Sequence, residues 1–84
     1  MNPRKLLLKA LQSPHNLRFA EVCSLAEAFG FRLSRTGGSH HIYVHPAIPE
    51  LLNLQEVQGQ AKAYQVRQLL RLVERHNLEI GDAE

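Results

Sequence analysis

The sequence predicts a small α+β domain in which helices cover one side of an antiparallel sheet. Three observations support this fold class: apolar residues follow the helical period in the first and last thirds of the chain, they alternate with polar residues in the middle third, and glycine-containing turns separate the alternating segments. A chain of 84 residues is too short to form two hydrophobic cores. We therefore treat residues 1–84 as a single domain.

The composition is typical of a globular protein, with 44% apolar and 21% charged residues. The longest apolar run, Leu6–Leu8, is far shorter than the roughly 20 residues that span a bilayer, so we expect a cytoplasmic protein without membrane contact. Because Cys23 is the only cysteine, an internal disulfide and a multi-cysteine zinc site are excluded. Residues 1–78 carry ten basic and five acidic side chains, a balance that suits a polyanion such as RNA.

The first element is a helix over 2–12, within an N-terminal extension formed by residues 1–16. Pro3 fits the first turn of a helix, and Leu7, Leu8 and Leu11 recur at spacings that place them on one face. Pro14 ends this helix, because proline disfavours helical geometry at the residue before it.

A second helix is predicted over 17–29. Its apolar residues recur at spacings that place them on one face: Phe19, Val22, Cys23, Ala26 and Phe29. Gly30 then ends the helix in the left-handed conformation that glycine adopts without strain.

Two strands follow, over 31–35 and 39–45, joined by a turn at Thr36-Gly37-Gly38. Because side chains alternate along a strand, the second strand has one face with His40, Ile42 and Val44 and an opposite face with Ser39, His41, Tyr43 and His45. The apolar pair on the first face indicates that this is the covered face.

The second half of the chain continues with a third strand over 51–54, a polar loop over 55–63 and a last helix over 64–77. Val66, Leu69, Leu70 and Val73 form the apolar stripe of this helix. The main part of the domain is thus residues 17–78. Residues 79–84 form an acidic tail, which we expect to be mobile.

The motif Gly38-Ser39-His40-His41-Ile42-Tyr43, preceded by Gly30-Phe31 and followed by His45-Pro46, resembles the HicA toxin family of small bacterial mRNA endoribonucleases. The segment Gly59–Leu70 resembles the approach to the last helix of the family. Two features depart from its pattern: the helix over 2–12 is additional, and Leu54-Gln55-Glu56-Val57 stands where members have Val-Pro-x-His.

The resemblance implies a double-stranded-RNA-binding-domain-like α-β-β-β-α fold with an extra N-terminal helix. It also implies a toxin of a type II toxin–antitoxin system that cleaves mRNA by histidine acid–base chemistry, without metal or other cofactor, and a HicB-type antitoxin as partner. The implied catalytic histidine is His40. Because some members carry their histidine one position later, His41 is the alternative.

Cleavage of RNA without a metal needs a base, a proton donor and cations around the phosphate. His40 can supply the base, with His41 or Tyr43 as an auxiliary proton source. Neighbouring strand residues face apart, so His40 and His41 reach one phosphate together only if the strand twists or bulges. His41 and His45 share a face but lie about 13 Å apart at roughly 3.3 Å per residue, so we predict no metal site.

We expect RNA contacts from the turn, from the strand after it and from basic residues near the last helix, namely Gly38, Ser39, Tyr43, Lys62, Arg67 and Arg71. Arg67, Arg71 and Arg75 recur every fourth residue, which suits a phosphate-binding face and a solvated face equally. Two other functions remain open: a non-catalytic RNA-binding module of the same fold, and a protein-interaction domain that uses the N-terminal helix. The sequence predicts no oligomeric state.

Overall fold

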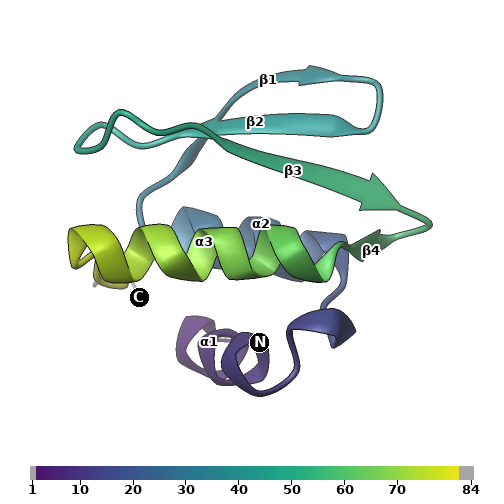
Figure 1. The fold of residues 1–84 in the computed structure, drawn as a ribbon, viewed down its shortest axis with the longest axis horizontal. Helices are drawn as coiled ribbons and strands as arrows, with labels where there is room; N and C mark the ends of the chain where they lie inside the picture. Colours follow the sequence, from purple (N-terminus) through teal and green to yellow (C-terminus); the bar gives the residue numbers. More distant parts are fainter. Residues whose placement is uncertain (1, 82–84) are drawn as a thin grey trace.

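The computed structural model describes residues 2–81, which form three α-helices and one sheet. The helices are α1 (Pro3–Gln12), α2 (Phe19–Ala28) and α3 (Ala63–His76), and the strands are β1 (Arg32–Gly37), β2 (His40–Val44), β3 (Leu52–Val57) and β4 (Gln60–Ala61). A 3-10 turn, Pro14–Asn16, joins α1 to α2. Figure 1 shows the sheet above α2 and α3, with α1 on their other side. The predicted α+β class, with a helix added before an α-β-β-β-α core, is confirmed.

The sheet is antiparallel and its strands lie in the order β1-β2-β3-β4. The expectation of a loop over 55–63 was wrong, because β3 continues to Val57 and the chain turns back into β4. The turn is made by Gln58 (φ 53°) and Gly59 (φ 80°). Two successive residues with positive φ match the twist of a two-residue hairpin, which brings β4 back beside β3.

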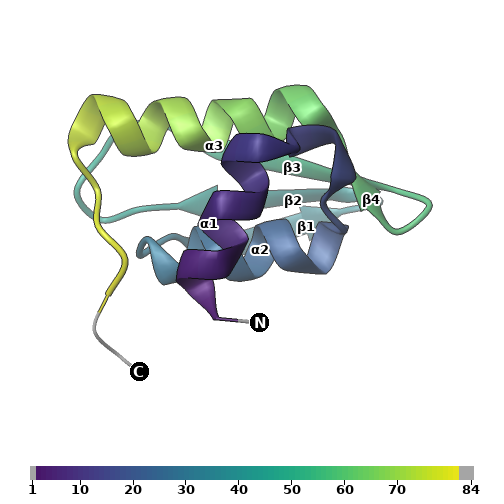
Figure 2. The ribbon, with the colours of Figure 1, turned by 90° about the horizontal axis from the view of Figure 1, so that it is seen from below.

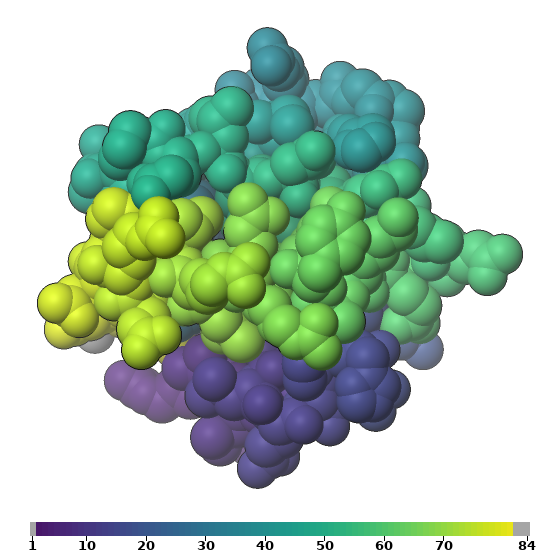
Figure 3. All heavy atoms as spheres, viewed as in Figure 1, coloured from purple at the N-terminus to yellow at the C-terminus, as the bar shows by residue number. Residues whose placement is uncertain are grey.

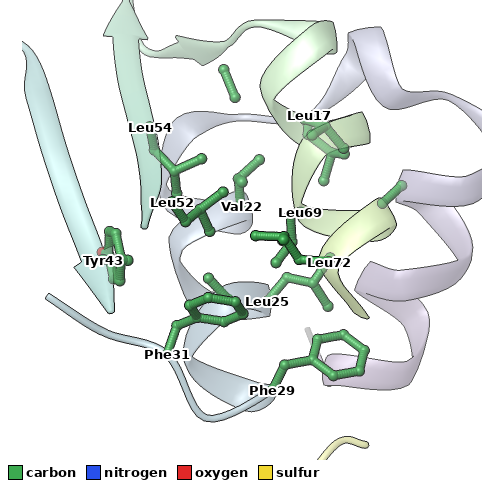
Figure 4. Packing of buried hydrophobic residues seen from close by; sticks show 14 of the residues in the cluster. Leu17, Val22, Leu25, Phe29, Phe31, Tyr43, Leu52, Leu54, Leu69 and Leu72 are labelled. Carbon is green, nitrogen blue, oxygen red and sulfur yellow. The ribbon is translucent and has the colours of Figure 1, made fainter. Parts of the chain in front are cut away.

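The core lies between the sheet and the two helices beneath it. Figure 4 shows Tyr43, Leu52 and Leu54 of the sheet facing side chains of α2 and α3. The prediction that the face with His40 is covered was therefore wrong: Tyr43 is 3% exposed, whereas His40 is exposed. The cause is the register, which pairs Tyr43 with Leu52 and His41 with Leu54, and both leucines are fully buried.

The additional helix α1 lies over α2 on the side away from the sheet, as Figure 2 shows from below. The predicted apolar face packs only in part, since Leu7 of that face packs against the core. Leu6 and Ala10, one turn apart, are buried, whereas Leu8 and Leu11 are 58% and 60% exposed. The Nζ of Lys9 lies 3.1 Å from the Oε1 of Glu21 and joins α1 to α2.

The chain after α3 packs instead of extending freely, at least as far as residue 81. Asn77 ends α3 in the left-handed conformation (φ 53°), and Leu78 and Ile80 pack against the core. The Gly81 N–H donates to the Ala28 carbonyl at 2.9 Å. The acidic residues Asp82 and Glu84 lie outside the described residues. In residues 2–81, every helix is too short or too polar to cross a membrane.

Candidate active site on the central strand

The two adjacent histidines at the start of β2 lie on opposite faces of the sheet. His40 is opposite Gln55 of β3, and His41 is opposite Leu54, whose side chain is in the core. The β2 strand is regular here, because its pairing with β1 is irregular only between Leu33 and Arg35. The two imidazoles therefore cannot reach one phosphate together, in agreement with the alternation expected from the sequence.

His40 is exposed on the open face of the sheet, which none of the helices formed by residues 2–81 covers. Its Nδ1 is 3.2 Å from the Oδ1 of Asn53 on β3. An amide oxygen only accepts hydrogen bonds, so this contact is the one that a neutral imidazole makes as its Nδ1–H tautomer, with the lone pair on Nε2. The hydrogen bonds found among residues 2–81 leave that Nε2 unengaged. His40 thus has the arrangement of a general base, with one nitrogen anchored and the other able to accept a proton.

His41 lies on the covered side and is half-buried. Its ring meets that of Phe19, the first residue of α2, edge-on, with the centroids 4.7 Å apart. Its Nδ1 is 3.3 Å from the backbone carbonyl oxygen of Ser39, which also places the proton on Nδ1. His41 is therefore held between the turn and the N-terminus of α2, and part of its ring packs as an apolar surface.

The turn before β2 is formed by Gly38 and Ser39. Gly38 has φ of +59°, and a β-carbon placed there would meet no atom within 4 Å, so the requirement for glycine is the left-handed backbone and not a lack of space. The Ser39 carbonyl accepts the Glu56 N–H at 3.1 Å as well as the His41 ring N–H. The turn is thereby tied to β3 through its backbone.

Tyr43 does not lie where the sequence prediction places an RNA contact or an auxiliary proton source. Its side chain is buried in the core. Burial, with a smaller contribution from Cys23, raises the pKa of Tyr43 above its usual range. The prediction for Tyr43 is corrected accordingly: it is a packing residue on the face opposite His40.

The predicted basic residues lie along the exposed side of α3, which crosses the middle of the face in Figure 3. Lys62 precedes the helix, and its Nζ lies 6.0 Å from the ring centroid of Tyr64. Arg75 forms an ion pair with Glu50 at 3.0 Å. Arg67 and Arg71, by contrast, form no ion pair with any side chain of residues 2–81. Lys62, Arg67 and Arg71 are thus exposed before and along α3, which lies under the sheet, whereas His40 lies on the opposite, open face of the sheet.

Sequence reasoning missed three polar residues that share the face of His40: Asn53, Arg32 and Arg35. The register places Arg32 opposite Val44, Arg35 opposite Ile42, and Asn53 on the other side of Ile42. The sequence does mark Asn53 as unusual, because asparagine is depleted in strands and Asn53 stands between Leu52 and Leu54, which both point into the core. Its partner depends on the register, which the sequence does not give.

His45, directly after β2, makes two hydrogen bonds. Its Nε2 donates to the Phe29 carbonyl at 3.0 Å, and its Nδ1 accepts the Ala47 N–H at 3.0 Å. The Nε2 of His76 lies 3.0 Å from the Oε1 of Glu50. In the described part of the chain, no three His, Cys, Asp or Glu side chains gather in a way that would hold a metal ion.

Comparison with known proteins gives one match. The sequence profile of a family described as "HicA toxin of bacterial toxin-antitoxin" matches residues 19–74. This range extends from the start of α2 into the last turns of α3 and leaves α1 outside. It includes His40, His41 and Asn53. No curated protein and no solved structure matches the chain.

Proposed function

The chain belongs to the HicA toxin family and so to the toxins of toxin–antitoxin systems, and from this premise we propose that it is an mRNA endoribonuclease that uses His40 as general base and acid. The observation that carries the proposal is the state of His40: an exposed imidazole whose Nδ1–H is anchored to Asn53 and whose Nε2 is free. His41 also has Nδ1 anchored, but its ring packs against Phe19.

The proposed reaction needs only groups of the chain and of the RNA. The Nε2 of His40 takes the proton of a ribose 2′-hydroxyl, and the 2′-oxygen attacks the adjacent phosphorus. The bond from phosphorus to the 5′-oxygen breaks, and the imidazolium of His40 returns the proton to that oxygen. The products are a 2′,3′-cyclic phosphate and a 5′-hydroxyl. No metal or cofactor takes part in this scheme.

Cations that can stabilise the phosphate lie on the same face of the sheet as His40. Arg32 and Arg35 are exposed on β1 and share the open face with His40. We place further phosphates of the RNA at the Gly38–Ser39 turn and along α3. The α3 contacts would come from Lys62, Arg67 and Arg71, which are exposed. The proposed partners are mRNA, as the substrate, and a HicB-type antitoxin. The antitoxin is proposed because a cell cannot tolerate the toxin without one.

A non-catalytic RNA-binding module is the second candidate, and the two exposed arginines on the open face favour it as much as they favour a nuclease. Induced expression in bacteria separates the two. The wild type, His40→Ala and His41→Ala are compared for growth and for the integrity of a reporter mRNA, and circular dichroism checks that each variant folds. The proposal predicts arrest and mRNA loss that only His40→Ala abolishes. Intact mRNA with the wild type would favour the binding module.

A further inference from the structure

We propose that Asn53 is a positioning residue for His40: its amide oxygen holds the imidazole as the Nδ1–H tautomer, so that Nε2 is the proton acceptor. This inference rests on the proposed function for its catalytic consequence, but the tautomer itself is a property of the folded chain. The contact that carries it is the distance of 3.2 Å between the Nδ1 of His40 and the Oδ1 of Asn53.

The contact follows from the geometry of the antiparallel ladder. Asn53 is opposite Ile42, so it is the diagonal neighbour of His40 on the same face of the sheet. Diagonal neighbours are separated by about 7 Å between α-carbons, a gap that a histidine and an asparagine side chain close together. Gln55, directly opposite His40, makes no hydrogen bond to the ring in the described structure.

Asn53 is carried by a rigid part of the fold. Its two neighbours along β3, Leu52 and Leu54, are fully buried in the core. One residue further, the Gln55 backbone N–H donates at 2.7 Å to the side-chain oxygen of Gln65, which is itself buried on α3. The backbone of β3 is thus fixed from the opposite face, and the exposed Asn53 side chain projects from it beside His40.

The position of the proton matters for the proposed reaction. An imidazole acts as a base through the nitrogen that lacks the proton, and the hydrogen bond made by the other nitrogen decides which nitrogen that is. Without Asn53, either ring nitrogen of an exposed histidine can carry the proton and the ring can rotate. Part of the His40 population would then present an N–H toward the substrate instead of a lone pair.

Nitrogen-15 NMR of the histidine rings tests the inference without any RNA. Two-bond proton–nitrogen spectra of the neutral rings are compared for the wild type, Asn53→Ala and the matched control Gln55→Ala, which removes an amide from the same face of the same strand. We expect His40 to show the Nδ1–H pattern in the wild type and in Gln55→Ala, and to shift toward Nε2–H in Asn53→Ala.

The other histidines serve as references in the same spectra. His41 is expected to keep Nδ1–H in all three proteins, because its acceptor is the Ser39 backbone carbonyl. His45 is expected to keep Nε2–H, because its Nδ1 accepts the Ala47 N–H. An Nε2–H pattern for His40 in the wild type, or a pattern that Asn53→Ala leaves unchanged, would overturn the inference.

A second measurement tests the catalytic consequence. Asn53→Ala is expected to lower kcat about tenfold with little change in KM, since it affects the orientation of the base and not RNA binding. Asn53→Asp places a carboxylate beside the ring and stabilises the imidazolium, so the acidic limb of the pH–rate profile should move to higher pH. Equal kcat and pH profiles in wild type, Asn53→Ala and Asn53→Asp would refute a positioning role.

The two proposals fail in different ways. A wild-type protein that cleaves no RNA refutes the nuclease, while the NMR spectra still decide whether Asn53 sets the tautomer. A wild type that cleaves RNA, together with an Asn53→Ala variant of undiminished kcat, leaves the nuclease in place and removes Asn53 from its mechanism.

Discussion

A β-carbon added at Gly30 would lie 2.8 Å from the Nε2 of His45. Gly30 follows α2 with φ of +99°, and His45 follows β2. The turn after α2 therefore lies directly against the end of β2. The same Nε2 donates to the Phe29 carbonyl, and the ring of His45 lies edge-on to that of Phe31 with centroids 5.1 Å apart. The glycine is thus required both for its backbone conformation and for space.

Gly30→Ala should destabilise the fold by about 2 kcal/mol or more, because it combines a left-handed residue with displacement of the His45 ring. The matched control is Gly37→Ala, since a β-carbon there meets nothing within 4 Å and φ is not positive. Urea unfolding measures both variants. Equal losses at the two positions would show that the contact with His45 contributes nothing.

Glu21 should make stability depend on pH in the acid range. A hydrogen bond from the Arg18 backbone N–H lowers the pKa of Glu21 below 4.5, against desolvation and with further help from Lys9. Because the pKa of Glu21 is lowered in the folded state, its contribution to the free energy of unfolding is present above about pH 4.5. This contribution is lost as the pH falls through the pKa of Glu21 in the folded protein.

Glu21→Gln should therefore lower the free energy of unfolding by about 1 kcal/mol at pH 7 and by less at pH 3. Lys9→Gln is the control that removes the ion pair between α1 and α2 and keeps the bond to the Arg18 N–H. Urea unfolding at the two pH values measures both variants. A loss for Glu21→Gln that is the same at pH 3 as at pH 7 would contradict this account.

Tyr43→Phe tests the correction made for this residue. Removing the hydroxyl of this buried ring should change stability by about 1 kcal/mol or less and leave RNA cleavage within about twofold of wild type. Loss of cleavage in a folded Tyr43→Phe protein would return the phenol to the mechanism as a proton donor.

Local patterns were sufficient to predict the three helices and the first three strands in their order, but not β4. The helical face of α2 was correct at Phe19, Val22, Ala26 and Phe29, which are buried, and Gly30 adopts the predicted left-handed conformation. These features depend on residues within a few positions of each other along the chain, where spacing and backbone preference act directly.

The errors arose where long-range pairing decides. Both faces of β2 carry apolar residues, and only the register with β3, which sets Tyr43 beside Leu52, determines which face the helices cover. In α1, the buried pair is Leu6 and Ala10, because the small Ala10 side chain permits close approach to α2 where Leu8 and Leu11 would not. Asn53 was missed for the same reason, since its partner His40 is 13 residues away along the chain.

The most direct test of the central claim is cleavage of a labelled RNA by the purified protein in the presence of a metal chelator, with wild type, His40→Ala and His41→Ala compared at equal folded concentration. The account predicts fragments with 2′,3′-cyclic phosphate ends from the wild type, a loss of rate of about 10²-fold or more for His40→Ala, and cleavage retained by His41→Ala. Full activity of folded His40→Ala would contradict the account, and loss of activity only in His41→Ala would move the chemistry to the other face of β2.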